Sequence, residues 1–581
     1  MSAPADRNRV RTLAAEYAEI VNSDDMNRRR RACLAALGGT AGACREYLCP
    51  SRSETQVLRM GGAMGFLFGS GEEVTDGSVE APRGVSRSAG TVAWALRGVL
   101  VILCLFCLLS WARVTWQRVR YPYEVDYAEG VLLAKAALLA GGVPPYAATT
   151  TLPYVPLVYP PLFVALWAPF TVPAGLAFWP GRLIACLGLL LAVACLVRIV
   201  RHFRGGWSTC LLAATCFLWL PPVRVWSGLA RVDTLSLGLS ALGLCVFIVA
   251  PARARGWGTL CFILAVLTKQ SVLAAPLAAY VALFWSGERR AALRQALLFA
   301  AGVGGALAAL QLVTGGALLR DIVVGNLLAW SLHALAKGLK DFLQGAPLLL
   351  AAALGAVPTA LARPQTRVLA IYVALGLAAT LMYGKVGAGP NYLLESCFGL
   401  VLIFTCVVRP QLGRPLRRGT LNELAVALVF VQLLLVAYPM TPHGPDGDRD
   451  TQARLIRLVR ALPGEVLGWP MGPIVQAGKT LWIEPDENCQ MALAGHWDEA
   501  PLRELVRQHY FAAVLMGDSL PATSSVVTDL HTERWSPTML RVLDREYQIT
   551  DRVGWVLVLR PRGHAAAGEG AGNGHERRAP L

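Results

Sequence analysis

Residues 121–161, YPYEVDYAEGVLLAKAALLAGGVPPYAATTTLPYVPLVYPP, decide how the rest of the chain is interpreted. Three carboxylates, Glu124, Asp126 and Glu129, lie close together in this stretch, which falls between one long apolar segment and a series of others. Charged side chains beside a membrane are costly, and they are retained where they are paired or functional. The three acids of this stretch therefore need an explanation, which the rest of the chain has to supply.

The composition is that of a polytopic membrane protein. Of the 581 residues, 55% are hydrophobic and only 16% are charged, and the mean hydropathy is positive. A formal net charge of +16 is also typical of nucleic-acid-binding proteins, but here the basic residues fall in short clusters between apolar runs. That pattern follows the positive-inside rule of membrane proteins, so no nucleic-acid partner is predicted.

Apolar runs close to the length needed to span a bilayer predict about eleven membrane helices, the fifth and sixth of them short. The predicted helices are residues 92–111, 180–200, 207–222, 234–250, 256–268, 271–285, 291–313, 345–361, 368–383, 392–408 and 421–438.

Arginines on alternate loops predict the orientation of these helices. The clusters are Arg198, Arg201 and Arg204; Arg253 and Arg255; Arg289, Arg290 and Arg294; Arg363 and Arg367; and Arg409, Arg414, Arg417 and Arg418. That side is predicted to be cytoplasmic, with the N-terminus cytoplasmic and the C-terminus outside. The long loop 112–179 is then external, with an interfacial helix at 126–139 and a juxtamembrane segment at 162–178.

The chain is predicted to divide into four parts. Residues 1–90 are expected to be a basic, disordered cytoplasmic arm, unless translation begins at Met60 or Met64. Residues 91–439 form the transmembrane part, 440–561 a small extracytoplasmic α/β domain, and 562–581 a disordered tail. In the outer domain the pattern predicts helices at 451–461, 498–510 and 537–547, and strands at 465–469, 511–516 and 553–559.

The loop acids suit proton-transfer chemistry. A carboxylate that is partly desolvated and near other acids has a raised proton affinity, which favours a general base. The alternative is a solvated loop whose acids offset Arg113, Arg118 and Arg120. Composition alone leaves both interpretations open.

Basic groups at external helix ends favour a phosphate ligand. Arg231, with Asp233 beside it, and Lys269 fall where predicted helices begin or end, and such cations could hold an anionic lipid headgroup. Lys269 could equally cap a helix end. Lys337 and Lys340, in the external segment 316–344, suit the same ligand or a plain interfacial helix.

Two further motifs add polar candidates. Asn391 lies in the glycine-rich outward turn YGKVGAGPNY, which could close over a substrate or simply be a turn. Tyr159 belongs to the YPPL motif at the end of the opening stretch. Walker, HExxH and GxSxG patterns and arrays of CxxC pairs are absent from the sequence, so ATP-driven transport, zinc proteolysis and serine hydrolysis have no support.

Over residues 92–560 the order of these motifs resembles the bacterial integral-membrane glycosyltransferases of the GT-C superfamily. These include proteins like the protein O-mannosyltransferases and the lipid A aminoarabinose transferases. The motifs are YEVDYAEG in the first external loop, YPPL, an R-x-D at a helix start, TKQS at a hairpin tip, G-P-N-Y and a small outer domain.

The resemblance implies a GT-C-like fold and transfer of a hexose or pentose from a polyprenyl-phosphate lipid to a glycan, lipid or protein acceptor. The base would be Asp126, with Glu124 and Glu129 as competitors, because the family often has an adjacent Asp-Glu pair where this chain has Glu-x-Asp. The substrate-binding candidates are Tyr159, Arg231, Asp233, Lys269, Lys337, Lys340 and Asn391. Aminoarabinose-transferase relatives place a metal-binding Glu near YPP that is missing here, so no cofactor is predicted, although a divalent metal stays possible.

Two alternatives remain at this point. A transporter or flippase of lipid-linked sugar would favour charges near the bilayer midplane and inverted repeats, neither of which the sequence shows. A relative that has lost catalysis and only binds lipid-linked glycan fits the altered spacing of the acids.

Overall fold

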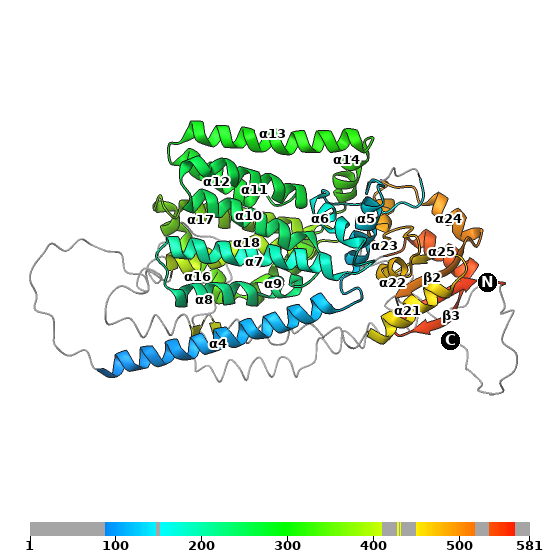
Figure 1. Ribbon diagram of the computed structural model, residues 1–581, viewed down its shortest axis with the longest axis horizontal. Coiled ribbons are helices and arrows are strands. Elements are labelled where there is room, and N and C mark those ends of the chain that lie inside the picture. Colours follow the sequence, from blue (N-terminus) through cyan, green and yellow to red (C-terminus); the bar gives the residue numbers. More distant parts are fainter. Residues whose placement is uncertain are drawn as a thin grey trace, which may run out of the picture. The chain divides into compact units, whose positions relative to one another are not determined.

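The computed structural model describes residues 87–146, 151–408, 427–428, 430–431, 449–517 and 534–563. The predicted arm (1–90), the predicted eleventh membrane helix (421–438) and the predicted tail (562–581) lie largely outside these residues. Residues from Gly84 onward form one compact unit, which holds a bundle of long helices and a small domain built on a β-sheet (Figure 1).

The bundle is made of helices that follow the predicted apolar runs closely. They are α4 (Arg87–Arg120), α7 (Trp179–His202), α8 (Trp207–Trp219), α9 (Pro221–Trp226), α10 (Val232–Val249), α11 (Arg255–Thr268), α12 (Ala274–Trp285), α13 (Arg289–Val313), α15 (Leu332–Gly345), α16 (Pro347–Ala362), α17 (Arg367–Ala379) and α18 (Leu394–Ile403). Short 3-10 turns lie at η1 (Ala252–Ala254), η2 (Val324–Asn326), η3 (Thr380–Gly384) and η4 (Pro390–Leu393), and α18 continues as a π-helical turn, η5 (Phe404–Val408).

In the described part of the chain, six helices are long and apolar enough to cross a membrane. A seventh span results if α15 and α16, which meet at an angle of 95°, count as one. The chain is therefore a multi-pass membrane protein, and its described part has fewer full-length spans than the ten predicted helices that fall within it. The difference arises because helices such as α8 (13 residues) and α12 (12 residues) are shorter than the roughly 17 residues that cross a bilayer unaided.

The first helix runs further than its hydropathy predicted, to Arg120 rather than 111. Arg118 stays in this helix because its guanidinium donates to the backbone carbonyls of Arg224, Val225 and Ser227. The first long connection consequently begins at Tyr121.

Glycines set the closest helix packing in the bundle. A Cβ on Gly188 of α7 would lie 2.4 Å from the Cα of Leu235 in α10, and one on Gly238 would lie 2.2 Å from the carbonyl oxygen of Gly188. Small residues let two membrane helices touch through their backbones. This contact fixes where α10 begins, and with it the position of the charged residues at its N-terminus.

Successive helices alternate in direction, so their connections gather at two ends. At one end, the arginine end, lie Arg198, Arg201 and Arg204, Arg253 and Arg255, Arg289, Arg290 and Arg294, and Arg363 and Arg367. Arg255 pairs there with Glu288 across 2.5 Å, and Arg367 stacks on Trp285. The predicted segregation of arginines is confirmed for these clusters, whereas Arg409, Arg414, Arg417 and Arg418 lie outside the described residues. Which end faces the cytoplasm stays a prediction.

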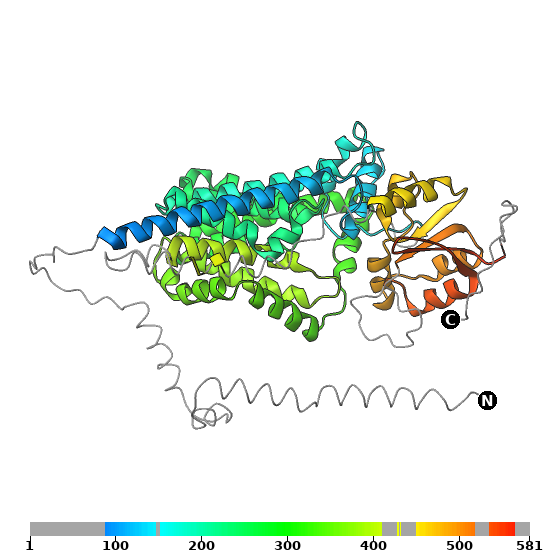
Figure 2. The same ribbon diagram turned by 90° about the horizontal axis from the view of Figure 1, so that it is seen from below.

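The opposite end, the domain end, carries the first long connection. It contains α5 (Tyr127–Ala140) and α6 (Leu162–Thr171), with α14 (Ala317–Ile322) beside them. Buried side chains of α5, α6 and α14 share one hydrophobic cluster with Met471 and Val475 of the sheet domain. These helices therefore form a layer between the bundle and the sheet domain. Figure 2 shows the sheet domain beyond one end of the bundle.

The sheet domain has four strands in the order β1-β2-β4-β3, from β1 (Glu465–Gly468), β2 (Phe511–Gly517), β3 (Tyr547–Val553) and β4 (Val556–Pro561). The β1–β2 pair is parallel and the other two pairs are antiparallel. Its helices are α21 (Arg449–Ala461), α22 (Met471–Gln476), α23 (Pro485–Leu493), α24 (Ala500–Arg507) and α25 (Pro537–Glu546). The mixture of helices and a sheet that the sequence predicts for this part of the chain is confirmed, whereas its extracytoplasmic location stays a prediction. Strand β3 and helices α22 and α23 are additions that the sequence pattern did not indicate.

Candidate active site

A cavity of about 270 Å³ opens between the bundle and the sheet domain. Its wall combines residues from the loop before α5, the start of α10, the turn before α18 and helix α23. The polar and aromatic lining side chains are Asp126, Tyr127, Trp226, Arg231, Asn391, Asp486, Glu487, Gln490 and Arg534. The structure thus brings three of the sequence-predicted residues, Asp126, Arg231 and Asn391, to one cavity.

Asp126 is the loop acid that borders this cavity. It is the N-cap of α5, where its Oδ1 accepts a hydrogen bond from the backbone N–H of Ala128. The same Oδ1 lies 2.6 Å from Nη1 of Arg231, and 18% of the Asp126 side chain is exposed. Burial raises the pKa of Asp126, and the Arg231 charge offsets this only in part.

Glu129 is sealed inside the protein. Its side chain is 0% exposed and pairs with Arg182, which is also 0% exposed, across 2.6 Å. Its Oε1 accepts a further hydrogen bond from the backbone N–H of Ala230, and its Oε2 accepts one from Val125. Burial alone raises the pKa of Glu129, but the Arg182 charge and these hydrogen bonds together hold it below its ordinary value.

Glu124 joins the loop to the sheet domain. Its two carboxylate oxygens accept hydrogen bonds from the backbone N–H of Gly130 in α5 (3.0 Å) and of Gly472 in α22 (2.9 Å). A Cβ on either glycine would come within 2.6 Å of the Glu124 side chain, so both positions need glycine for this contact. Burial raises the pKa of Glu124 well above its ordinary value.

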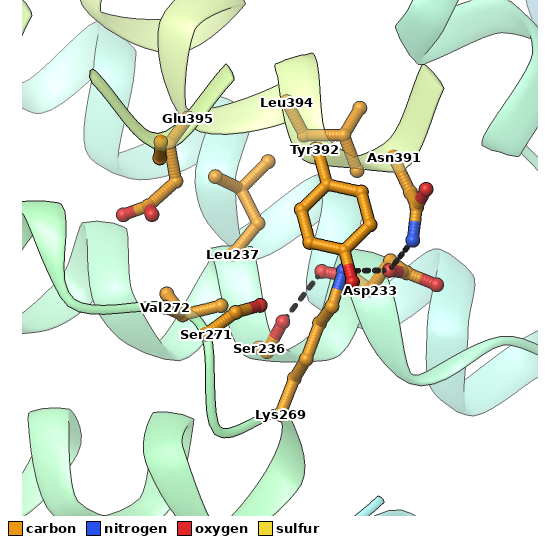
Figure 3. Close-up of a pocket in the computed structure, with 11 residues that line it drawn as sticks. Asp233, Ser236, Leu237, Lys269, Ser271, Val272, Asn391, Tyr392, Leu394 and Glu395 are labelled. Atoms are coloured by element: carbon orange, nitrogen blue, oxygen red, sulfur yellow. Dashed lines mark hydrogen bonds and ion pairs between the residues drawn. The ribbon is translucent and has the colours of Figure 1, made fainter. Parts of the chain in front are cut away.

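Asp233 accepts hydrogen bonds from several polar groups behind the cavity. Its Oδ1 accepts from Nζ of Lys269 (2.6 Å) and from Nδ2 of Asn391 (2.8 Å), as Figure 3 shows. Its Oδ2 accepts from the indole N–H of Trp226. Lys269 lies over the ring of Tyr392, 4.4 Å from its centroid, and both Asp233 and Lys269 are almost fully buried.

Arg231 connects this network to Asp126. One side of its guanidinium faces Asp126, and Nε lies 3.8 Å from Oδ2 of Asp233. Nη2 donates a long hydrogen bond of 3.3 Å to the hydroxyl of Tyr159. The Nε donor itself has no hydrogen-bond partner within the described ranges. Arg231 thus stands at the cavity wall with Asp233 and Lys269 behind it.

Lys337 and Lys340 lie elsewhere. Both are exposed on α15, and neither belongs to the lining of the 270 Å³ cavity. Tyr159 borders a smaller neighbouring cavity of about 40 Å³, which it shares with Tyr127, Glu484 and Glu487.

The sequence interpretation missed the contribution of the sheet domain. Asp486, Glu487 and Gln490 project from α23 into the cavity, and Arg534 hydrogen-bonds Asp486 at 3.3 Å while stacking on Trp469. Burial raises the pKa of Glu487 to about 7. The sequence did contain a sign of this contribution, because the run Glu484-Pro-Asp-Glu has three acids close together, as residues 121–161 do.

Arg182 was missed for a different reason. It lies in the first turn of an apolar helix, where a single arginine looks like an interfacial residue. In the structure its guanidinium binds Glu129 and also donates to the carbonyls of Arg118, Tyr121 and Tyr123, which fixes the whole turn before α5.

The described residues offer no cluster of metal ligands. Among them, no group of three or more His, Cys, Asp or Glu side chains is arranged to hold a metal ion. Of the three acids that line the cavity, Asp126 pairs with Arg231 and Asp486 pairs with Arg534, so two of the three carboxylates are bound by arginines rather than arranged as metal ligands.

Comparisons with known proteins find similarity in the fold. No protein-family model matches the chain, and no curated protein sequence matches it. The crystal structure of ArnT from Cupriavidus metallidurans bound to undecaprenyl phosphate superimposes with a TM-score of 0.55 at 13% identity, over 80% of this chain and 99% of that one. The apo state of the same enzyme gives a TM-score of 0.51 at 12% identity, over 82% and 98%.

A third structure, the Archaeoglobus fulgidus oligosaccharyltransferase in complex with Zn and sulfate, has a TM-score of 0.47 at 10% identity, over 72% of this chain and 68% of that one. The chain therefore has a fold like that of the GT-C membrane glycosyltransferases. This confirms at the level of the fold the resemblance that the motifs indicate.

Proposed function

We propose that this protein is a glycosyltransferase that moves a sugar from a polyprenyl-phosphate donor to an acceptor hydroxyl, with Asp126 as the base. The observation that carries the proposal is the position of Asp126. It borders a cavity between the bundle and the sheet domain, beside Arg231, whereas Glu129 is sealed by Arg182. The fold likeness to ArnT, a structure of which contains undecaprenyl phosphate, supports this class of donor.

The chemistry needs few groups. Asp126 takes the proton of the acceptor hydroxyl, the acceptor oxygen forms a bond to the anomeric carbon, and the bond from that carbon to the phosphate oxygen breaks. The departing phosphate carries the negative charge, and Arg231 at the cavity wall stabilises it. A single displacement of this kind inverts the anomeric carbon. No step is assigned to a metal ion.

The ion pair between Asp126 and Arg231 links donor binding to the base. Without donor, the guanidinium holds the carboxylate at 2.6 Å and lowers its proton affinity. A phosphate that binds Arg231 competes for the same N–H groups and brings a second negative charge. The proton affinity of Asp126 then rises, so the base becomes stronger when the donor is in place.

Lys269 and Asp233 act in this proposal as positioning residues. Asp233 is held by Lys269, Asn391 and Trp226 and faces Nε of Arg231, so it fixes the guanidinium. We place the site at the outer face of the cytoplasmic membrane, because the arginine end satisfies the positive-inside rule and lies opposite.

The proposal is tested in proteoliposomes with radiolabelled polyprenyl-phosphate hexoses and pentoses and a membrane-glycan acceptor extract. We expect Asp126→Asn to reduce transfer by about 10²–10⁴-fold, the range for loss of a general base. The matched control is Asp544→Asn, because Asp544 is an exposed aspartate of the sheet domain. Transfer at the wild-type rate in Asp126→Asn would rule out the assigned base. Sugar lipid that crosses the bilayer without product would favour a flippase instead.

A further inference from the structure

A second cavity lies far from the Asp126 cavity, between α12 and α13 at the arginine end. It is an open groove of about 450 Å³. Its wall consists of aliphatic and aromatic side chains apart from two arginines, and the lining residues are Tyr280, Val281, Phe284, Ala292, Leu293, Ala296, Arg289 and Arg290. Ala292 and Ala296 leave the space, because larger residues at these positions of α13 would fill it.

Helix α13 is exposed along most of its length. Of its 25 residues, only Ala292 and Gln295 are buried, and Leu293 and Leu297 are each about 60% exposed. Figure 1 shows α13 along one edge of the bundle. Since an apolar helix of this length crosses the bilayer, lipid surrounds it, and the groove opens to hydrocarbon rather than to water.

The mouth of the groove is positively charged. Arg289 and Arg290 occupy the first turn of α13 and are exposed, and the Arg289 guanidinium lies 5.2 Å from the ring centroid of Phe284. The neighbouring acid, Glu288, is already bound by Arg255 through two hydrogen bonds. In the part of the chain that is described, neither Arg289 nor Arg290 forms an ion pair. The positive end of the α13 dipole adds to their charge.

We propose that the α12–α13 groove binds an anionic glycerophospholipid of the surrounding bilayer, with one acyl chain in the groove and the phosphate on Arg289 and Arg290. The site is separate from the Asp126 cavity. Helix α11 runs from Arg255, which pairs with Glu288 at the groove mouth, to Thr268 next to Lys269, and 14 helical residues span about 20 Å. The bound lipid contacts both α12 and α13, because both helices line the groove.

The test measures which lipids stay on the purified full chain. The protein is incubated with a micellar mixture of phosphatidylglycerol and phosphatidylcholine and then examined by native mass spectrometry. We expect preferential retention of phosphatidylglycerol, reduced about fivefold by Arg289→Gln or Arg290→Gln alone. Ala296→Phe should reduce retention of phosphatidylglycerol as well, because it fills the groove and leaves both arginines in place.

The matched control is Arg253→Gln with Arg363→Gln, which removes two exposed arginines from the same end but not from the groove. This control should retain phosphatidylglycerol like the wild type. Thermal unfolding without added lipid shows that each variant is folded. Inorganic phosphate is added as a competitor and should not displace phosphatidylglycerol, because it has no hydrocarbon chain to fill the groove.

Three results would overturn the proposal. One is equal retention of the two phospholipids, and another is an equal loss in the control. The third is a change of oligomeric state in Ala296→Phe, which would show that a second copy of the chain occupies the groove.

Discussion

The two ends of the helical bundle differ in how their charged side chains are buried and paired. At the domain end, Arg182, Arg231 and Lys269 are at most 5% exposed, and each has a carboxylate partner at 2.6 Å. At the arginine end, Arg253 and Arg290 are exposed, and the Arg255–Glu288 pair is itself partly open to solvent. A buried charge without a partner is costly, so the domain end has been built to hold its charges in place. The arginine end needs only to carry charge, which suffices to orient the protein.

Breaking the most deeply buried pair should have the largest effect. Arg182→Met leaves Glu129 buried without its cation and releases the turn before α5, so we expect the free energy of unfolding to fall by about 3–5 kcal/mol. Thermal unfolding in detergent measures it. Arg198→Met, on the same helix but exposed at the arginine end, should stay within about 0.5 kcal/mol. Similar losses in both variants would contradict the difference between the ends.

A smaller effect is expected behind the cavity. Lys269→Met should cost about 1–3 kcal/mol, because Asp233 keeps its hydrogen bonds from Asn391 and Trp226. Asp233→Asn should cost a similar amount, and the double variant should cost less than the sum, since the two residues share one ion pair. A double-mutant cycle on unfolding free energies measures the coupling. If the losses of unfolding free energy in the two single variants simply add in the double variant, Asp233 and Lys269 do not stabilise the protein as an ion pair.

The sheet domain's side of the cavity should respond to pH. Burial raises the pKa of Glu487 from 4.5 to about 7, so its contribution to stability is fully present below pH 4.5 and is lost as the pH rises through 7. Relative to the wild type, Glu487→Gln should gain roughly 3 kcal/mol between pH 4.5 and pH 8, because a difference of one in pKa corresponds to about 1.4 kcal/mol. Unfolding curves at these two pH values measure this. Glu504→Gln, an exposed acid of the same domain, should show no such gain.

The smallest effect is expected for the lysines of α15. Lys337→Ala and Lys340→Ala should each change the unfolding free energy by less than about 0.5 kcal/mol, because both side chains are exposed. Donor affinity should also change little, since neither lysine borders the cavity. A lipid-binding assay with undecaprenyl phosphate tests this. A tenfold loss of affinity for undecaprenyl phosphate would show that the two lysines bind the substrate after all.

Much of the candidate site could be predicted from the sequence, because charged residues stand out against apolar helices. The charges of Asp126 and Arg231 and the glycine-rich turn that holds Asn391 mark these residues in the sequence, and the three meet at one cavity. The choice among the three acids could not be made, since Glu124, Asp126 and Glu129 differ only in their partners. Those partners come from residues far along the chain, namely Gly472, Arg231 and Arg182.

The sequence by itself determined that this is a multi-pass helical protein with arginines gathered on alternate connections and a small α/β domain after the last apolar run. These properties depend on hydropathy and on local periodicity, and both follow from residues that are close together in the sequence. Only the tertiary structure decided which carboxylate of residues 121–161 stays open and that α23 completes the cavity. Burial and pairing depend on which distant segments pack together, and that packing is what seals Glu129 and leaves Asp126 beside Arg231.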